Sequence, residues 1–178
     1  MFEQNTPDWS SIDASSDAEY KKPCAGGYVV RIVDAKDDNE HEKLVVTFDI
    51  AEGEFTGYYM NDEYRAARPY MHQFYVSYKE KAMGLFKHFF ECVEQSNNWK
   101  WDGHNEKAFV GKVMGIVLAE EEYIGNDGAV KTRFSRLVDY KTVDQIRNGE
   151  FKVKETKRVA QDISNNQVVV DDFSDVPF

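Results

Sequence analysis

Arginine, lysine and tyrosine side chains are interleaved along residues 64–81 of the sequence. Proteins that hold single-stranded nucleic acid without reading its sequence need cations that follow the phosphates and aromatic rings on which the bases stack. This stretch supplies both, and further basic and aromatic residues occur near positions 31, 100 and 133. The residue types therefore predict a nucleic-acid-binding surface made of Arg31, Arg65, Arg68, Tyr70, Tyr75, Tyr78, Lys79, Lys81, Trp99, Trp101, Lys131, Arg133 and Arg136.

Not every ring in this set can face outward. A small β-barrel needs large side chains to fill its interior, so Phe74 or Tyr75 is expected in the core. Trp99 and Trp101 fit equally well as a lid over one end of a barrel and as a platform for bases. Each ring that does stack on a base is expected to contribute ~1–3 kcal/mol to binding.

The net charge of −10 argues against a nucleic-acid partner unless the acidic residues lie away from the binding surface. Residues 1–20 carry −5, and residues 34–43 and 155–178 carry −3 each, so the rest of the chain carries +1. Residues 64–88 carry +4. A basic segment in an acidic protein is expected of a groove that binds a polyanion. A solvated helix face with unrelated lysines explains it about as well.

The last eight residues suggest a second kind of chemistry. Acidic side chains surround Phe173, and the sequence finishes on an apolar Val-Pro-Phe. Such a segment can place its last ring in a pocket of another protein while the carboxylate meets a basic side chain there. A merely solubilising acidic segment would not require the Pro-Phe ending. The predicted partner-binding residues are Asp171, Asp172, Phe173, Asp175, Val176, Pro177 and Phe178.

Catalytic chemistry is weakly indicated. The sequence has no nucleophile elbow, phosphate-binding loop, dinucleotide-binding glycine motif or zinc-protease motif. His88 and Cys92 are spaced to offer two metal ligands from one helix, but no second pair follows, and Cys92 fits a core position better. Glu120 and Glu122 can converge on one face of a strand, where a solvated strand end is the simpler interpretation. We therefore predict no catalytic residue, no metal site and no cofactor.

The elements that position these residues follow from periodicity and turn signals. Alternation of apolar and polar residues predicts the strands, and apolar residues spaced three and four apart predict a central helix. The pairs Ser77–Glu80 and Thr142–Gln145 match capping boxes that would open two helices, and Gly125–Gly128 is a hairpin turn signal. The expected strands are 27–35, 43–51, 56–60, 109–123 and 130–141, and the expected helix is 77–95.

Three strands, a helix and two strands form the element order of the OB-fold, a five-stranded Greek-key barrel with its helix between strands 3 and 4. We therefore predict a mainly β fold of this kind followed by a disordered acidic C-terminal tail. Without an apolar run long enough for a membrane or a disulfide framework, the chain is expected in the cytoplasm. The expected organisation is a flexible arm (1–22), the OB-fold domain (23–153), a linker (154–170) and a partner-docking tip (171–178).

Long segments of the chain resemble a known family. The sequences PCAGGYVVRIVDAK, FDIAEGEFTGYY, FYVSYKEKAMGLFKHFFECVEQSN and GKVMGIVLAEEEYIGNDGAVKTR are similar to a single-stranded DNA-binding protein family of phages and prophages of Gram-positive hosts. The ending DDFSDVPF resembles the acidic tip of bacterial single-stranded DNA-binding proteins, with Ser174 interrupting the acidic run. The resemblance covers about residues 23–153 and implies a cytoplasmic role in phage replication or recombination. It also implies an annealing protein, helicase or primase as partner.

Two other classes of function remain open from the sequence. An acidic adaptor or DNA mimic that binds an enzyme without contacting DNA would use the net charge and the tip, but would leave the basic segment 64–81 unexplained. A metal-dependent nuclease is a third possibility, which incubation of labelled single strands with magnesium or manganese would test. Both a monomer and a homo-oligomer are compatible with the sequence.

Overall fold

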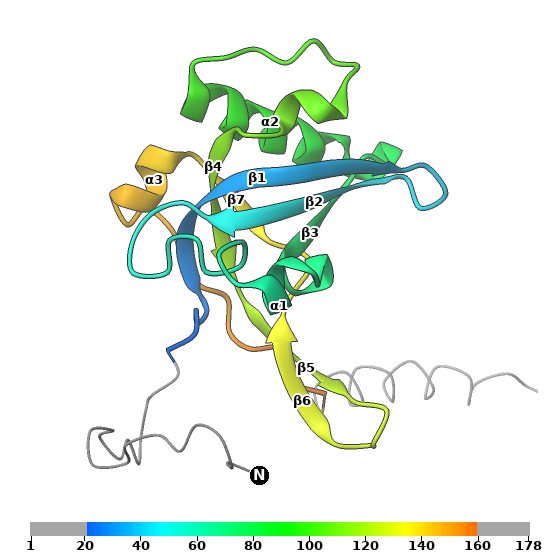
Figure 1. Cartoon of the computed structure of the whole chain (residues 1–178). Helices are drawn as coiled ribbons and strands as arrows, with labels where there is room; N and C mark the ends of the chain where they lie inside the picture. Colours follow the sequence, from blue (N-terminus) through cyan, green and yellow to red (C-terminus); the bar gives the residue numbers. More distant parts are fainter. Residues whose placement is uncertain (1–20, 160–178) are drawn as a thin grey trace, which may run out of the picture.

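The computed structural model describes residues 21–159, and their architecture is mainly β (Figure 1). Five antiparallel strands form one curled sheet in the order β3-β2-β1-β4-β7. A separate two-stranded hairpin continues from β4. The sheet strands are β1 (Gly26–Asp38), β2 (Lys43–Ile50), β3 (Gln73–Ser77), β4 (Val113–Leu118) and β7 (Asp139–Lys141), and the hairpin strands are β5 (Glu120–Ile124) and β6 (Val130–Phe134).

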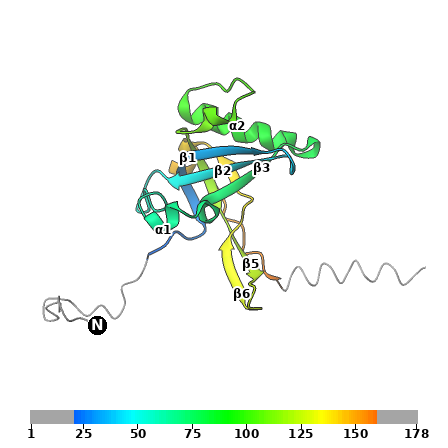
Figure 2. The same cartoon turned by 45° about the vertical axis from the view of Figure 1, so that its right-hand side comes forward.

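Helices and 3-10 turns occupy the β2–β3 and β3–β4 connections and follow β7. The longest, α2 (Met83–Asn97), packs against β3, β4 and β7. It covers one side of the curled sheet, while the β5–β6 hairpin projects from the opposite side (Figures 1 and 2). The shorter helices are α1 (Glu63–Ala66), α3 (Val143–Arg147) and the 3-10 turns Pro69–His72, Glu80–Ala82 and Glu106–Phe109.

The sheet curls far enough for its two edges to approach each other. The backbone amide of Tyr75 on β3 donates to the carbonyl of Arg136, just before β7, at 2.9 Å. The Tyr140 hydroxyl on β7 donates to the Tyr75 carbonyl at 3.2 Å. Alternate side chains of each strand point into the enclosed space. Phe89 of α2 fills this space and packs against the rings of Phe74, Phe109 and Tyr140. Closure of the sheet thus depends on residues at both edges.

Several expected elements are confirmed. The first two strands, the end of the long helix and the hairpin turn lie where the sequence predicted them. Asn98 ends α2 in the left-handed conformation with φ of 47°. At α3, the Thr142 side chain accepts from the Gln145 amide while the Gln145 side chain accepts from the Thr142 amide, so this capping box forms as expected.

The predicted third strand at 56–60 is wrong, because this segment forms turns. Gly57 adopts a φ of +74° and its amide donates to the Ile50 carbonyl, which bends the chain back directly after β2. The third strand lies instead at β3, in a segment for which the sequence predicted no strand. There Phe74 and Val76 are buried while Gln73, Tyr75 and Ser77 alternate with them.

The capping box predicted for Ser77 and Glu80 does not form. The Ser77 hydroxyl accepts from the Lys79 amide, and a 3-10 turn precedes the start of α2 at Met83.

The two long strands predicted at 109–123 and 130–141 each divide in two. Pairing of β4 with β1 ends at the Gly26–Leu118 pair, so beyond Leu118 the chain must find another partner, and β5 pairs with β6.

Within residues 21–159, no helix combines the length and the apolar character that crossing a lipid bilayer requires.

Candidate nucleic-acid interface

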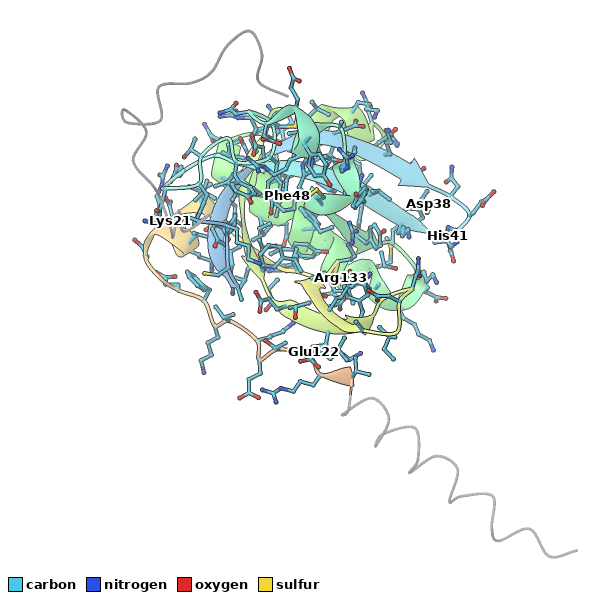
Figure 3. The ribbon with its side chains drawn as sticks, turned by 60° about the horizontal axis from the view of Figure 1, so that its bottom comes forward. Lys21, Asp38, His41, Phe48, Glu122 and Arg133 are labelled. Carbon is cyan, nitrogen blue, oxygen red and sulfur yellow. The ribbon has the colours of Figure 1, made fainter. Side chains whose placement is uncertain are left out.

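A cleft of about 670 Å³ lies between the β5–β6 hairpin and the side of the sheet formed by β2, β3 and the 3-10 turn before β3. We call it the hairpin cleft. Figure 3 looks into this side of the molecule, with Phe48 and Arg133 labelled. Aromatic and basic side chains dominate its lining, which includes Lys22, Phe48, Tyr58, Tyr59, Tyr70, Gln73, Glu120, Tyr123, Arg133, Phe134 and Arg136.

The hairpin forms one wall of the cleft. Glu121 pairs with Arg133 across the strands, and Tyr123 pairs with Lys131. The Arg133 guanidinium lies 4.8 Å from the centre of the Tyr123 ring and its Nε donates to Glu121 at 2.8 Å. These cross-strand pairs fix the arginine along the wall.

The end of the described chain reinforces this wall. Lys157 pairs in parallel with Glu121, its amide donates to the Glu120 carbonyl, and its carbonyl accepts from the Glu122 amide. The Val159 amide donates to the Glu122 carboxylate at 3.3 Å. The region that the sequence assigned to a linker therefore begins with residues that bind the hairpin.

Arg136 forms the junction between the hairpin and the sheet. Its carbonyl accepts the hydrogen bond that brings the sheet edges together, and its guanidinium lies 5.8 Å from the centre of the Tyr75 ring. Its Nη1 is buried and has no hydrogen-bond acceptor among the described residues. Buried donors are nearly always paired, so this nitrogen needs an acceptor that the described residues do not supply, and an anionic oxygen is the strongest one.

Rings of two kinds meet in the cleft. Phe48 and Tyr59 are buried and form its base, where the Tyr59 ring stacks on His72 with centroids 4.8 Å apart. Burial raises the pKa of Tyr59 and lowers that of His72, so both side chains are neutral near pH 7. Tyr70 is different, because 59% of it is exposed and no cation or ring of the described residues covers it. It is the ring best placed to stack on a base.

Arg65 and Arg68 each stack on a tyrosine of this chain and donate a hydrogen bond to its carbonyl. Arg65 stacks on Tyr58 at 4.0 Å and its Nε donates to the Tyr58 carbonyl at 2.6 Å. Arg68 stacks on Tyr64 at 3.6 Å and donates to the Tyr64 carbonyl at 2.9 Å. Since Tyr58 lines the hairpin cleft, Arg65 positions part of the lining rather than presenting a free charge to a ligand.

Five other predicted residues lie away from the hairpin cleft, in the segment before α2 and in the loop after it. Trp101 packs on Phe109 with centroids 5.0 Å apart and its indole nitrogen donates to the Asn105 carbonyl. Trp99 packs on Phe109 from another side, so both tryptophans cover the core as a lid. The five residues, none of which lines the hairpin cleft, are Tyr78, Lys79, Lys81, Trp99 and Trp101.

The two remaining predicted residues each interact with a polar group of this chain. Arg31 is exposed on β1 and donates from Nη1 to the Gly111 carbonyl at 3.0 Å. Lys131 lies near the tip of the hairpin and pairs with Asp127 at 3.1 Å. The structure thus brings Tyr70, Arg133 and Arg136 into one cleft with Tyr75 beside them. The predicted partner-binding residues Asp171–Phe178 lie outside the described residues.

Most residues that line the cleft were not predicted from the sequence, among them Lys22, Gln73, Tyr123 and Phe134. Pairing across the predicted hairpin would have found Tyr123 and Phe134, because counting outward from the 125–128 turn brings Glu121 opposite Arg133 and Tyr123 opposite Lys131. No comparable signal exists for Lys22, which comes to the cleft through the path of the chain before β1.

The two candidate metal ligands, His88 and Cys92, lie side by side, and the histidine also faces a backbone carbonyl. His88 and Cys92 are neighbours, with Sγ 3.8 Å from Nε2, but that nitrogen also faces the Tyr140 carbonyl at 3.1 Å. Cys92 is buried, as expected, and burial raises the pKa of its thiol to about 11. Throughout residues 21–159, no three His, Cys, Asp or Glu side chains are grouped closely enough to hold a metal ion.

With this geometry defined, the sequence was compared with known proteins. No family model matches it. A search of curated proteins also finds no relative.

Proposed function

We propose that this protein binds single-stranded DNA in the hairpin cleft with little preference for sequence. The observation that carries the proposal is the buried Nη1 of Arg136, which has no acceptor within residues 21–159, in a cleft that also presents Arg133 and the exposed ring of Tyr70. Arginines that meet phosphates, next to rings that meet bases, are the recurring components of sites for single strands.

We further propose that the curled sheet is an OB-fold. Its strand order β3-β2-β1-β4-β7, the position of α2 between β3 and β4, and the approach of β3 to the chain before β7 support this assignment. OB-folds bind oligonucleotides over their second and third strands and the loops beside them, one of which joins the last two barrel strands. The hairpin cleft occupies the corresponding position, since β5 and β6 form the connection between β4 and β7.

The charges of the lining support a modest number of phosphate contacts. Among the described residues, its cations are Lys22, Arg133, which also pairs with Glu121, and Arg136, and its acidic member is Glu120. If three phosphates are neutralised, the logarithm of the association constant should fall with the logarithm of the salt concentration with a slope of about −2. A weak slope of this size distinguishes a short site from a groove that follows a long strand.

The test is a fluorescence-anisotropy titration of the full chain with labelled oligo-dT and with a duplex of equal length. The double variant Arg133→Ala/Arg136→Ala should weaken binding to oligo-dT about tenfold per arginine. Lys79→Ala/Lys81→Ala removes the same charge at residues the sequence also predicted, but outside the cleft, and should change the affinity less than about threefold. Equal affinity for duplex and single strand, or equal effects of the two double variants, would contradict the proposal.

The segment Asp171–Phe178 is proposed to recruit an annealing protein, helicase or primase during phage replication or recombination. The alternation of acidic and apolar residues in DDFSDVPF supports this role. Deletion of residues 171–178 should abolish capture of such a partner by the DNA-bound protein and leave the affinity for oligo-dT unchanged or higher. Phe178→Ala should reproduce the loss of capture, and Ser174→Ala is the control. Unchanged capture by the truncated chain would remove the docking role.

A further inference from the structure

A second hollow lies at another part of the molecule, between the β1–β2 turn and the loop that follows α2. It measures about 150 Å³ and shares no lining residue with the hairpin cleft. We call it the acidic end pocket, which is lined by Asp37, Leu44, Tyr78, Phe86, Trp101, Gly103, His104, Glu106 and Phe109. In Figure 3 the β1–β2 turn, marked by Asp38 and His41, lies apart from Arg133 of the hairpin.

Three rings form a continuous wall in this pocket. The centroid of Phe86 lies 6.1 Å from that of Tyr78 and 5.8 Å from that of Trp101, and both pairs meet edge to face. Each of the three side chains is half-buried, so part of each ring remains accessible. The negative faces of such rings attract a cation, and Trp and Tyr do so most strongly.

Two carboxylates at this wall are unmatched by cations. Asp34 pairs with Lys107 and Asp38 pairs with His41 and Lys43, but Asp37 and Glu106 have no ion-pair partner among the described residues. Asp37 instead accepts a hydrogen bond from the Tyr78 hydroxyl at 2.7 Å. This bond raises the pKa of Tyr78 to about 12, so the hydroxyl keeps its proton and remains the donor. The pocket therefore presents uncompensated negative charge beside aromatic faces.

We propose that the acidic end pocket receives an arginine side chain from a basic peptide segment of a partner protein. A guanidinium can stack on Trp101 or Tyr78 and at the same time donate to the carboxylates of Asp37 and Glu106. Phosphates are excluded here by like charge, since residues 34–43 carry −3. The proposal uses no residue of the hairpin cleft and stands or falls independently of DNA binding.

The experiment follows the indole N–H signals of the ¹⁵N-labelled full chain by NMR during titration with an acetylated, amidated tetra-arginine peptide. The Trp101 signal is assigned by Trp101→Phe. It is an apt reporter because its indole N–H bonds the Asn105 carbonyl beside the pocket. The peptide should shift the Trp101 signal, and a tetra-citrulline peptide of the same shape without charge should not.

Two double variants separate a pocket from a general charge effect. Asp37→Asn/Glu106→Gln keeps the side-chain shapes and should weaken peptide binding about tenfold or more. Glu40→Gln/Glu80→Gln removes the same charge from residues outside the pocket and should leave the affinity within about twofold. Thermal unfolding with unchanged midpoints shows that both variants are folded, so a difference in peptide affinity reflects the substituted carboxylates.

Several results would overturn the proposal. These are an unshifted Trp101 signal, equal binding of tetra-citrulline, equal effects of the two double variants, and a Trp101 shift caused by oligo-dT. A shift that grows with protein concentration alone, without peptide, would assign the pocket to a second copy of this chain and would likewise overturn the claim for a separate partner.

Discussion

The hairpin cleft and the acidic end pocket are both lined by aromatic rings and differ in the charges beside those rings. Among the described residues, a buried nitrogen of Arg136 in the cleft has no acceptor, and the carboxylates of Asp37 and Glu106 in the pocket have no ion-pair partner. Rings alone therefore do not define a ligand, because every base and many side chains can stack on them. The unpaired charge beside the rings decides which kind of ligand each hollow favours.

The two regions depend on one core, and the largest expected effect comes from breaking it. Phe89 is fully buried and its ring contacts Phe74, Phe86, Phe109 and Tyr140. Phe89→Ala should lower the free energy of unfolding by ~3–5 kcal/mol, measured by urea denaturation, and weaken both binding activities. Leu85→Ala on the same helix is the control, since Leu85 is 63% exposed and should change stability by less than about 0.5 kcal/mol. A small effect at Phe89 would show that the two regions are not held by a shared core.

The next largest effect is expected from substituting a tyrosine that lines the cleft, compared with an equally exposed tyrosine outside it. Tyr70→Ala should weaken oligo-dT binding by ~1–3 kcal/mol, because its exposed ring lines the cleft. Tyr64→Ala is matched in exposure, at 61% against 59%, but Arg68 already stacks on the Tyr64 ring. It should therefore change the affinity little. Anisotropy titrations of both variants at one salt concentration make the comparison, and equal losses would contradict the assignment of Tyr70.

Acid should affect the two regions at different pH. Burial lowers the pKa of His72 below its ordinary 6.5, so the unfolded chain binds the proton more readily. The free energy of unfolding should consequently fall as pH drops below about 6.5, and His72→Gln should flatten this slope between pH 7.5 and 5.5 in urea titrations. At the other region, hydrogen bonds from Lys107 and His41 lower the pKa values of Asp34 and Asp38. Their contribution should disappear only as the pH falls below about 4. An unchanged slope in His72→Gln would assign the pH 5.5–7.5 dependence to another group.

The smallest effect is expected from an ion pair at the margin of the acidic end. Asp34→Asn breaks the 2.7 Å pair with Lys107 and should cost about 0.2–1 kcal/mol of stability, because both side chains are partly exposed. Affinity for oligo-dT should stay within about twofold, since the substitution lies outside the hairpin cleft. Chemical denaturation and anisotropy measure the two quantities. A large change in DNA affinity would place the nucleic acid nearer to this region than we propose.

Local signals predicted much of the secondary structure. The alternation at 43–51, the turn at 125–128 and the capping box at Thr142 depend on neighbouring residues, and all three are confirmed. The failures have long-range causes. Turns replace the expected strand at 56–60 because the Tyr59 amide bonds the Asp49 side chain and the Gly57 amide bonds Ile50. The split of β4 from β5 depends on where the neighbouring β1 begins.

Residue types and spacing determined by themselves that the chain is mainly β, that a helix separates the third and fourth sheet strands, and that basic and aromatic residues are interleaved along residues 64–81. Only the tertiary structure decided which of those side chains are available. It placed Arg65 and Arg68 on neighbouring rings, moved Tyr78 and Trp101 to the acidic end, and joined Tyr70 to Arg133 and Arg136. The physical reason is that a side chain's pairing depends on partners from distant segments, whereas its tendency to form a strand or a helix is largely local.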